Sequence, residues 1–116
     1  MKNLKFILPL LLLGFFTSAS AQKSTVTETF KVLGNCGMCQ KTIQNAALNA
    51  GAKTATWDME AHSLTVTFKE GKTSVEKIQQ AVAKSGYDTP KFKATEAAYS
   101  GLHACCQYDR SESLEQ

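Results

Sequence analysis

The chain has 116 residues, which is enough for one small domain, and its composition is that of an ordinary globular protein. Hydrophobic residues make up 43% and charged residues 20%, which excludes an intrinsically disordered chain. The formal net charge of +3 is too weak, and the basic residues are too scattered, to predict a nucleic-acid-binding surface. Four cysteines in so short a chain remain to be explained.

The first 21 residues have the pattern of a secretory signal peptide. Lys2 and Lys5 precede an apolar run over residues 6–16, and Ala19-Ser20-Ala21 fits the small-residue cleavage site. The apolar run is shorter than the roughly 20 residues that a membrane-spanning helix needs. We therefore expect cleavage after residue 21 and a periplasmic or otherwise exported protein that has no membrane attachment after cleavage.

The first half of the remaining chain alternates between strand and helix patterns. Apolar and polar residues alternate from Val26 to Val32, which predicts a strand. From about Met38 to Ala50 the apolar residues recur at helical spacing, and Gly51 follows where a helix commonly ends. Alternation returns over residues 55–59 and 64–68 with a short turn between them, which predicts a β-hairpin.

A second helix and a last short strand follow the hairpin. Thr73 and Glu76 have the spacing of a capping box, and the apolar residues after them recur at helical spacing as far as Ser85-Gly86. Residues 87–93 leave room for one short strand, and Pro90 within it is typical of the edge of a sheet.

The resulting order β-α-β-β-α-β predicts a ferredoxin-like α+β sandwich. Its antiparallel sheet is expected to have four strands, with both helices on one face. This domain is predicted to span residues 22–94, after the signal peptide at 1–21. Residues 95–116 show no clear periodicity and are interpreted as a cysteine-containing C-terminal tail.

Cys36 and Cys39 form a CxxC pair in the loop before the first predicted helix. Cys39 falls in the first helical turn, where unpaired backbone N–H groups and the positive end of the helix dipole stabilise a thiolate. Gly34 and Gly37 allow the loop to bend so that both sulfurs face one point. Two thiolates with no carboxylate nearby in sequence favour a soft ion, Cu(I) or Hg(II), over Mg²⁺ or Ca²⁺.

Other interpretations of the CxxC pair stay open. It is also found in thioredoxin-like redox enzymes, but only one strand precedes it here, and a hairpin follows the helix. A closed Zn(II) site would need further ligands. The four cysteines form two close pairs, so a disulfide between the pairs that joins the two ends of the domain is another interpretation.

The segment Gly34-Asn35-Cys36-Gly37-Met38-Cys39 and the later Ser85-Gly86-Tyr87-Asp88 resemble the heavy-metal-associated domain. This family includes copper chaperones, metal-binding domains of copper-pumping ATPases and a periplasmic mercury-binding protein. The resemblance implies the βαββαβ fold and metal binding by Cys36 and Cys39. The family usually has Gly-Met-x-Cys-x-x-Cys, whereas this loop is one residue shorter and lacks that methionine.

The tail carries a second group of candidate ligands, His103, Cys105 and Cys106. They are predicted to form a second metal site or to fold over Cys36 and Cys39 as auxiliary ligands. A disulfide with the first pair, or simple packing, is the alternative. A lone histidine in the hairpin turn, His62, is expected to be solvated.

These observations predict a non-catalytic exported protein that captures Cu(I), with Hg(II) or Zn(II) as alternatives. The resemblance implies hand-over of the ion to a metal-transporting ATPase or another metal-binding protein. A monomer is expected. The competing hypotheses are a periplasmic thiol–disulfide oxidoreductase and a disulfide-linked interaction module.

Overall fold

A computed structural model describes residues 24–114, so the predicted signal peptide lies outside the described residues. The described part of the chain contains no helix long and apolar enough to cross a lipid bilayer. Its elements, in chain order, are β1 (Thr25–Lys31), α1 (Gly37–Asn49), β2 (Thr54–Asp58), β3 (Ser63–Lys69), α2 (Val75–Lys84), α3 (Glu96–Ser100) and the short 3-10 helix η1 (Ala104–Cys106).

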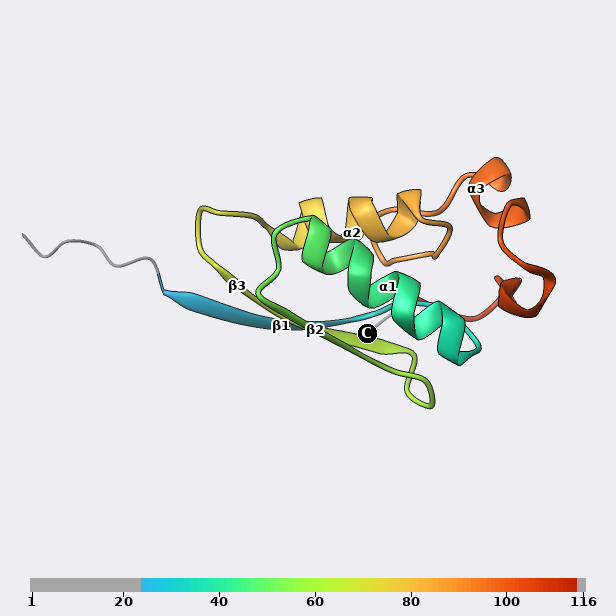
Figure 1. Cartoon of the computed structure of the whole chain (residues 1–116), viewed down its shortest axis with the longest axis horizontal. Helices are drawn as coiled ribbons and strands as arrows, with labels where there is room; N and C mark the ends of the chain where they lie inside the picture. The colour runs from blue at the N-terminus through green and yellow to red at the C-terminus, as the bar shows by residue number, and fades with distance from the viewer. Residues whose placement is uncertain (1–23, 115–116) are drawn as a thin grey trace, which may run out of the picture.

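The three strands form one antiparallel sheet in the order β1-β3-β2, and α1 and α2 both lie on one face of it (Figure 1). Leu64 of β3 stands opposite Phe30 of β1 and Trp57 of β2. Because side chains alternate along a strand, every second residue of β3 points toward the helices. Leu64, Val66 and Phe68 are accordingly buried. The ferredoxin-like α+β fold class is confirmed.

The helices complete the core with one apolar face each. Ile43 and Ala47 of α1 and Ile78 and Val82 of α2 are fully buried between the helices and the sheet. At about 25 cal/mol per Å² of apolar surface, burial of these side chains is the main force that holds the helices on the sheet. The predicted helices and the predicted hairpin are thus confirmed to within a residue or two.

The prediction of a fourth strand at residues 87–93 is wrong: in the described residues the sheet has three strands, and this segment is a turn. Two buried side chains bind the backbone that a strand would use. The Thr89 hydroxyl donates to the Phe92 carbonyl and accepts from the Phe92 N–H, and the Asp88 carboxylate accepts from the Ala94 N–H. Pro90 has no N–H to donate. One sheet-like bond remains, from the Leu33 N–H to the Asp88 carbonyl.

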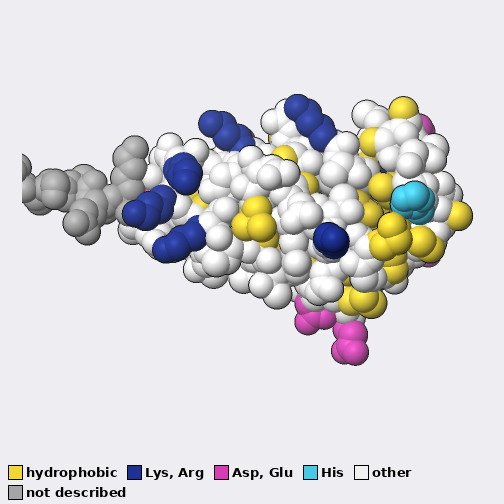
Figure 2. Space-filling model, viewed as in Figure 1, with side chains coloured by type: hydrophobic (Ala, Val, Ile, Leu, Met, Phe, Trp, Pro, Cys, Tyr) yellow, Lys and Arg dark blue, Asp and Glu magenta, His cyan; other side chains and the backbone are white. Residues whose placement is uncertain are grey.

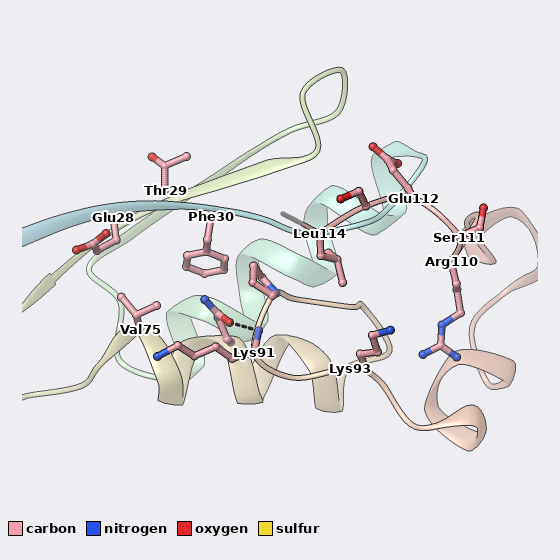
Figure 3. Close-up of a pocket in the computed structure, with 13 residues that line it drawn as sticks. Glu28, Thr29, Phe30, Val75, Lys91, Lys93, Arg110, Ser111, Glu112 and Leu114 are labelled. Carbon is pink, nitrogen blue, oxygen red and sulfur yellow. Dashed lines mark hydrogen bonds between the residues drawn. The ribbon is translucent and has the colours of Figure 1, made fainter. Parts of the chain in front are cut away.

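A groove of about 720 Å³ lies beside β1, where the fourth strand is absent (Figure 3). Phe30 of β1 and Leu114 of the tail point into it from one side, and the segment that carries Lys91 lies on the facing side. None of the four cysteines lines this groove. The groove is therefore separate from the chemistry of the cysteine loop.

The tail is more ordered than its sequence indicates. Its Thr95 side chain accepts a hydrogen bond from the Ala98 N–H and so caps α3. After η1 the chain returns along the domain, where Glu112 binds Lys31 at 3.2 Å and His62 at 2.7 Å. His62 also stacks on Trp57 with 6.1 Å between ring centroids. The expectation that His62 is solvated is therefore wrong, because the tail covers the hairpin turn.

The N-terminus of α2 differs from the predicted capping box by one residue. Ser74, not Thr73, is the N-cap, and its hydroxyl accepts from the Lys77 N–H at 3.2 Å. The Thr73 hydroxyl instead donates to the Ala50 carbonyl at 2.7 Å. Thr73 thus joins the end of α1 to the start of α2, a contact that sequence spacing does not show.

Replacement of Ser74 by alanine is expected to lower the free energy of unfolding by about 1 kcal/mol, because an N–H group at the start of α2 loses its acceptor. Urea unfolding followed by circular dichroism measures the change. The matched control is Ser74→Asp, which retains a capping oxygen and is expected to unfold near the wild-type midpoint. Equal midpoints for wild type and Ser74→Ala would contradict this assignment of the cap.

Candidate metal centre

The cysteine loop begins where the backbone passes closely over Trp57. The indole N–H of Trp57 donates to the Val32 carbonyl at 2.9 Å. A Cβ atom at Gly34 would lie 2.9 Å from the Trp57 ring and 3.2 Å from Ile43, so only glycine fits there without a shift. Trp57 therefore supports the segment that leads from β1 into the loop.

Cys36 and Cys39 lie at the start of α1, as predicted. Cys36 is the N-cap residue of the helix, and its side chain makes no capping hydrogen bond to the first turn. Cys39 is fully buried, and its thiol donates to the Asn35 side-chain oxygen at 3.2 Å. The two Sγ atoms are 3.0 Å apart, which confirms that the loop turns both sulfurs toward one point.

Cys106 of the tail joins this pair. Its Sγ lies 3.3 Å from the Sγ of Cys36, and the three Sγ atoms of Cys36, Cys39 and Cys106 all lie within 4.8 Å of one another. Cys106 is 3% exposed, so water has little access to it. All four cysteines are free thiols in this structure. Residues 70 positions apart thus meet at one point.

The other two tail candidates stay outside the cluster. Cys105 is exposed, and its Sγ is 3.8 Å from Cys106 and 4.0 Å from the Met38 sulfur. His103 is also exposed, and only its backbone is engaged, since its carbonyl accepts from the Cys106 N–H at 2.7 Å. In the part of the chain that the structure describes, no carboxylate or imidazole joins the three sulfurs.

The two ends of the cluster differ in acidity. Burial opposes ionisation of Cys36, but hydrogen bonds from the thiol and backbone N–H of Cys39, the Cys106 thiol and the Met38 N–H outweigh it and lower the pKa. Burial, reinforced by the neighbouring thiols of Cys36, Cys39 and Cys105, raises the pKa of Cys106 to about 12. The site therefore favours the thiolate form of Cys36 and the protonated form of Cys106.

Tyr87 lies beneath the cluster and is 1% exposed. Burial raises the pKa of its hydroxyl, and the adjacent Cys39 and Cys106 sulfurs raise it further. Tyr87 therefore keeps its proton and can donate a hydrogen bond to a thiolate. Tyr87 therefore packs in the core and also lies beside the cysteine sulfurs.

Two anchors fix the tail beside the cluster. The Tyr108 hydroxyl accepts from the Asp88 N–H and donates to the Gly86 carbonyl, both at 2.8 Å. The Arg110 guanidinium binds both oxygens of the buried Asp88 carboxylate at 2.8 Å, in a two-pronged pair. Sequence reasoning missed these anchors, because an isolated Tyr or Arg in an aperiodic tail carries no local signal of its partner.

The site opens toward an apolar end of the molecule. In Figure 2, hydrophobic side chains gather at the end where the start of α1 and the tail meet. The Lys and Arg side chains that this view shows lie elsewhere on the face. Met38, between the two loop cysteines, is 51% exposed. The cysteine loop therefore lies beside an apolar part of the surface.

The donor set fits a soft metal ion. Thiolates select ions such as Cu(I), whereas Mg²⁺ and Ca²⁺ require oxygen ligands that are absent from this cluster. Zn(II) prefers four ligands in a structural site, and this cluster offers three sulfurs. No pair of sulfurs is bonded, so no disulfide has to be reduced before an ion can bind.

Comparisons with known proteins agree with this chemistry. The family profile described as "Heavy-metal-associated domain" matches residues 29–88, just over half of the chain. No significantly similar protein was found among curated proteins.

Three solved structures share the fold over 54–56% of this chain. The CopZ metallochaperone is 28% identical, with a TM-score of 0.52 and 97% of its own length covered. Oxidized MerP from Ralstonia metallidurans CH34 is 34% identical, with a TM-score of 0.53 and 93% covered. The third is the N-terminal domain of a potential copper-translocating P-type ATPase from Bacillus subtilis in its Cu(I)-loaded state, with 25% identity, a TM-score of 0.53 and 84% covered. With the matched profile and the cysteine geometry together, this protein belongs to the heavy-metal-associated domain family.

Proposed function

We propose that this protein is an exported, non-catalytic carrier that captures a soft metal ion between Cys36 and Cys39. The observation that carries the proposal is the 3.0 Å separation of their Sγ atoms at the start of α1. The helix dipole and the lowered pKa of Cys36 favour a thiolate there without any metal bound. Cu(I) is the favoured ion and Hg(II) the alternative, since both accept a small number of soft sulfur ligands.

Hand-over to a partner follows from the position of the site. The site lies at one end of the molecule beside the exposed Met38, so a thiolate of a partner protein can reach the ion. A partner sulfur can add to the ion before an original sulfur leaves, and the ion is never free in solution. We propose a metal-transporting ATPase or another metal-binding protein as this partner. The likeness to a metallochaperone and to an ATPase domain in its Cu(I)-loaded state supports this choice.

Export is proposed from the signal-peptide pattern of residues 1–21. In an oxidising compartment the free thiols of the site must be kept reduced or be protected by the bound ion. Metal loading and cysteine oxidation are therefore competing fates of Cys36 and Cys39.

Metal titration of the reduced protein tests the proposal. We expect one Cu(I) per chain in competition with a chromogenic Cu(I) chelator, and no Cu(I) retained by the Cys36→Ser/Cys39→Ser double variant. Cys105→Ser is the matched control, because Cys105 is exposed and lies outside the cluster. No metal uptake by the fully reduced wild type would contradict the proposal. Catalytic reduction of insulin disulfides by the purified protein would favour the oxidoreductase hypothesis instead.

A further inference from the structure

We propose that Cys106 is a third sulfur ligand, so that the soft ion is bound by three thiolates of one chain. This inference rests on the proposed function, since it concerns the same ion at Cys36 and Cys39. It goes further in assigning a ligand outside residues 29–88, the part of the chain that the family profile matches.

The sulfur positions are close to those of a three-coordinate site. At a metal–sulfur distance of about 2.3 Å, three sulfurs in a plane around one ion lie about 4 Å apart. The Sγ atoms are 3.0 Å apart between Cys36 and Cys39 and 3.3 Å apart between Cys36 and Cys106. An increase of about 1 Å or less in these two separations makes room for the ion, which side-chain rotation can supply.

Cys106 is held in place by the fold around it. Its N–H donates to the His103 carbonyl, and its carbonyl accepts from the Tyr108 N–H. Tyr108 is itself anchored to Gly86 and Asp88, which adjoin Tyr87 under the cluster. A ligand that is positioned before the ion arrives loses little conformational entropy on binding.

When Cys106 binds the ion, a sulfur–metal bond replaces its S–H bond. As the Cys106 sulfur binds the ion, its S–H proton leaves to solvent and a sulfur–metal bond forms, with no change in oxidation state. Cu(I) and Hg(II) are the probes for such a site, because both accept three soft sulfurs. No carboxylate competes for the ion there, since the three sulfurs are the only group of three or more cysteine, histidine or carboxylate side chains in the described chain.

A third sulfur in the same chain also affects release of the ion. In a two-sulfur site, the first sulfur of a partner fills a vacant coordination position. Here Cys106 occupies that position, so a partner thiolate must displace it. The tail therefore retains the ion until a partner with a competing thiolate is present, and release to a weak competitor is slow.

X-ray absorption of the Cu(I)-loaded protein counts the sulfurs directly. We expect three sulfur neighbours in the wild type and two in Cys106→Ala, with one ion per chain in both by native mass spectrometry. Cu(I) affinity is expected to fall at least about tenfold in Cys106→Ala, since loss of even an outer partner of a metal site costs 10–100-fold. Transfer of the ion to a competing dithiol chelator is expected to be faster from this variant.

The control is Cys105→Ala, a neighbour in sequence whose side chain is exposed. It is expected to retain three sulfurs and the wild-type affinity. Cys106→Ser serves as a second variant, and circular dichroism establishes that each variant is folded.

Each outcome separates this inference from the proposed function. Two sulfurs in the wild type, or three in both wild type and Cys106→Ala, would overturn the role of Cys106 while leaving Cys36 and Cys39 as the binding pair. Loss of all metal binding in a folded Cys106→Ala would instead overturn the proposed function, which has Cys36 and Cys39 bind the ion by themselves, while leaving Cys106 as a ligand. Failure of the wild type to bind Cu(I) and Hg(II) would overturn both proposals.

Discussion

Replacement of Asp88 by alanine is expected to lower the free energy of unfolding by about 3 kcal/mol, the lower end of the range for a broken buried ion pair. The Asp88 side chain is 2% exposed and binds Arg110 through both oxygens, whereas the Arg110 side chain is 23% exposed. In the variant, water can therefore solvate part of the Arg110 guanidinium that has lost its partner. For this reason we expect a loss of folding free energy at the lower end of that range. Ala94 also loses the acceptor for its N–H.

The same change is expected to release the tail from the metal centre. Asp88 anchors Arg110 through its carboxylate, and Arg110 lies four residues after Cys106. Urea unfolding measures the stability, and X-ray absorption of the Cu(I)-loaded variant is expected to show fewer than three sulfurs. Glu96→Gln is the matched control. The Glu96 side chain is 87% exposed, so the loss of its charge beside Arg110 is expected to change the stability little. A wild-type unfolding midpoint for Asp88→Ala would contradict the anchoring role.

Trp57→Ala is expected to cost about 3–5 kcal/mol of folding free energy, the usual range for removal of a large buried aromatic. Trp57 is 1% exposed, packs under Gly34 and donates to the Val32 carbonyl. Small domains are stable by only about 5–15 kcal/mol, so a large share of the total would be lost. The cysteine loop would also lose the surface on which Gly34 lies, and weaker Cu(I) binding is expected at temperatures where the variant is still folded.

The measurement for Trp57→Ala is thermal unfolding followed by circular dichroism, because Trp57 is the single tryptophan and its fluorescence disappears with it. Met59→Ala is the matched control, since Met59 lies two residues away and is 41% exposed, and a change within about 0.5 kcal/mol is expected. If Trp57→Ala were no less stable than Met59→Ala, the support that Trp57 gives to the loop would be disproved.

The edge of the sheet at β2 shows how the site and the fold depend on each other. The Gln40 side chain donates to the Trp57 carbonyl at 2.9 Å, and the Gln44 side chain accepts from the Trp57 N–H at 3.0 Å. Both glutamines belong to α1, whose first turn carries the cysteine pair. Their bonds satisfy the outward backbone groups of Trp57 in an edge strand, and such groups otherwise tend to pair with other chains. They also fix the position of α1 on the sheet.

The sequence by itself determined the local elements and the cysteine pair of this protein. Strand alternation and helical spacing depend only on neighbouring residues, so the helices and the hairpin could be predicted with the fold class. The position of Cys36 and Cys39 before a helix is likewise local, and the spacing of two residues brings both sulfurs to the first turn.

Only the tertiary structure decided what depends on residues distant in sequence. Cys106 reaches Cys36 across 70 positions, and Cys105, its neighbour, faces outward. Composition could not separate these two adjacent cysteines, because the direction of η1 follows from the anchors of Tyr108 and Arg110. The prediction of a fourth strand was wrong for the same reason. Residues 87–93 have a local pattern that allows a strand, but the buried Asp88 and Thr89 side chains bind the backbone groups that a strand would use. Local patterns fix the conformation of a segment, whereas competition for hydrogen bonds and buried surface in the folded chain fixes which segments meet.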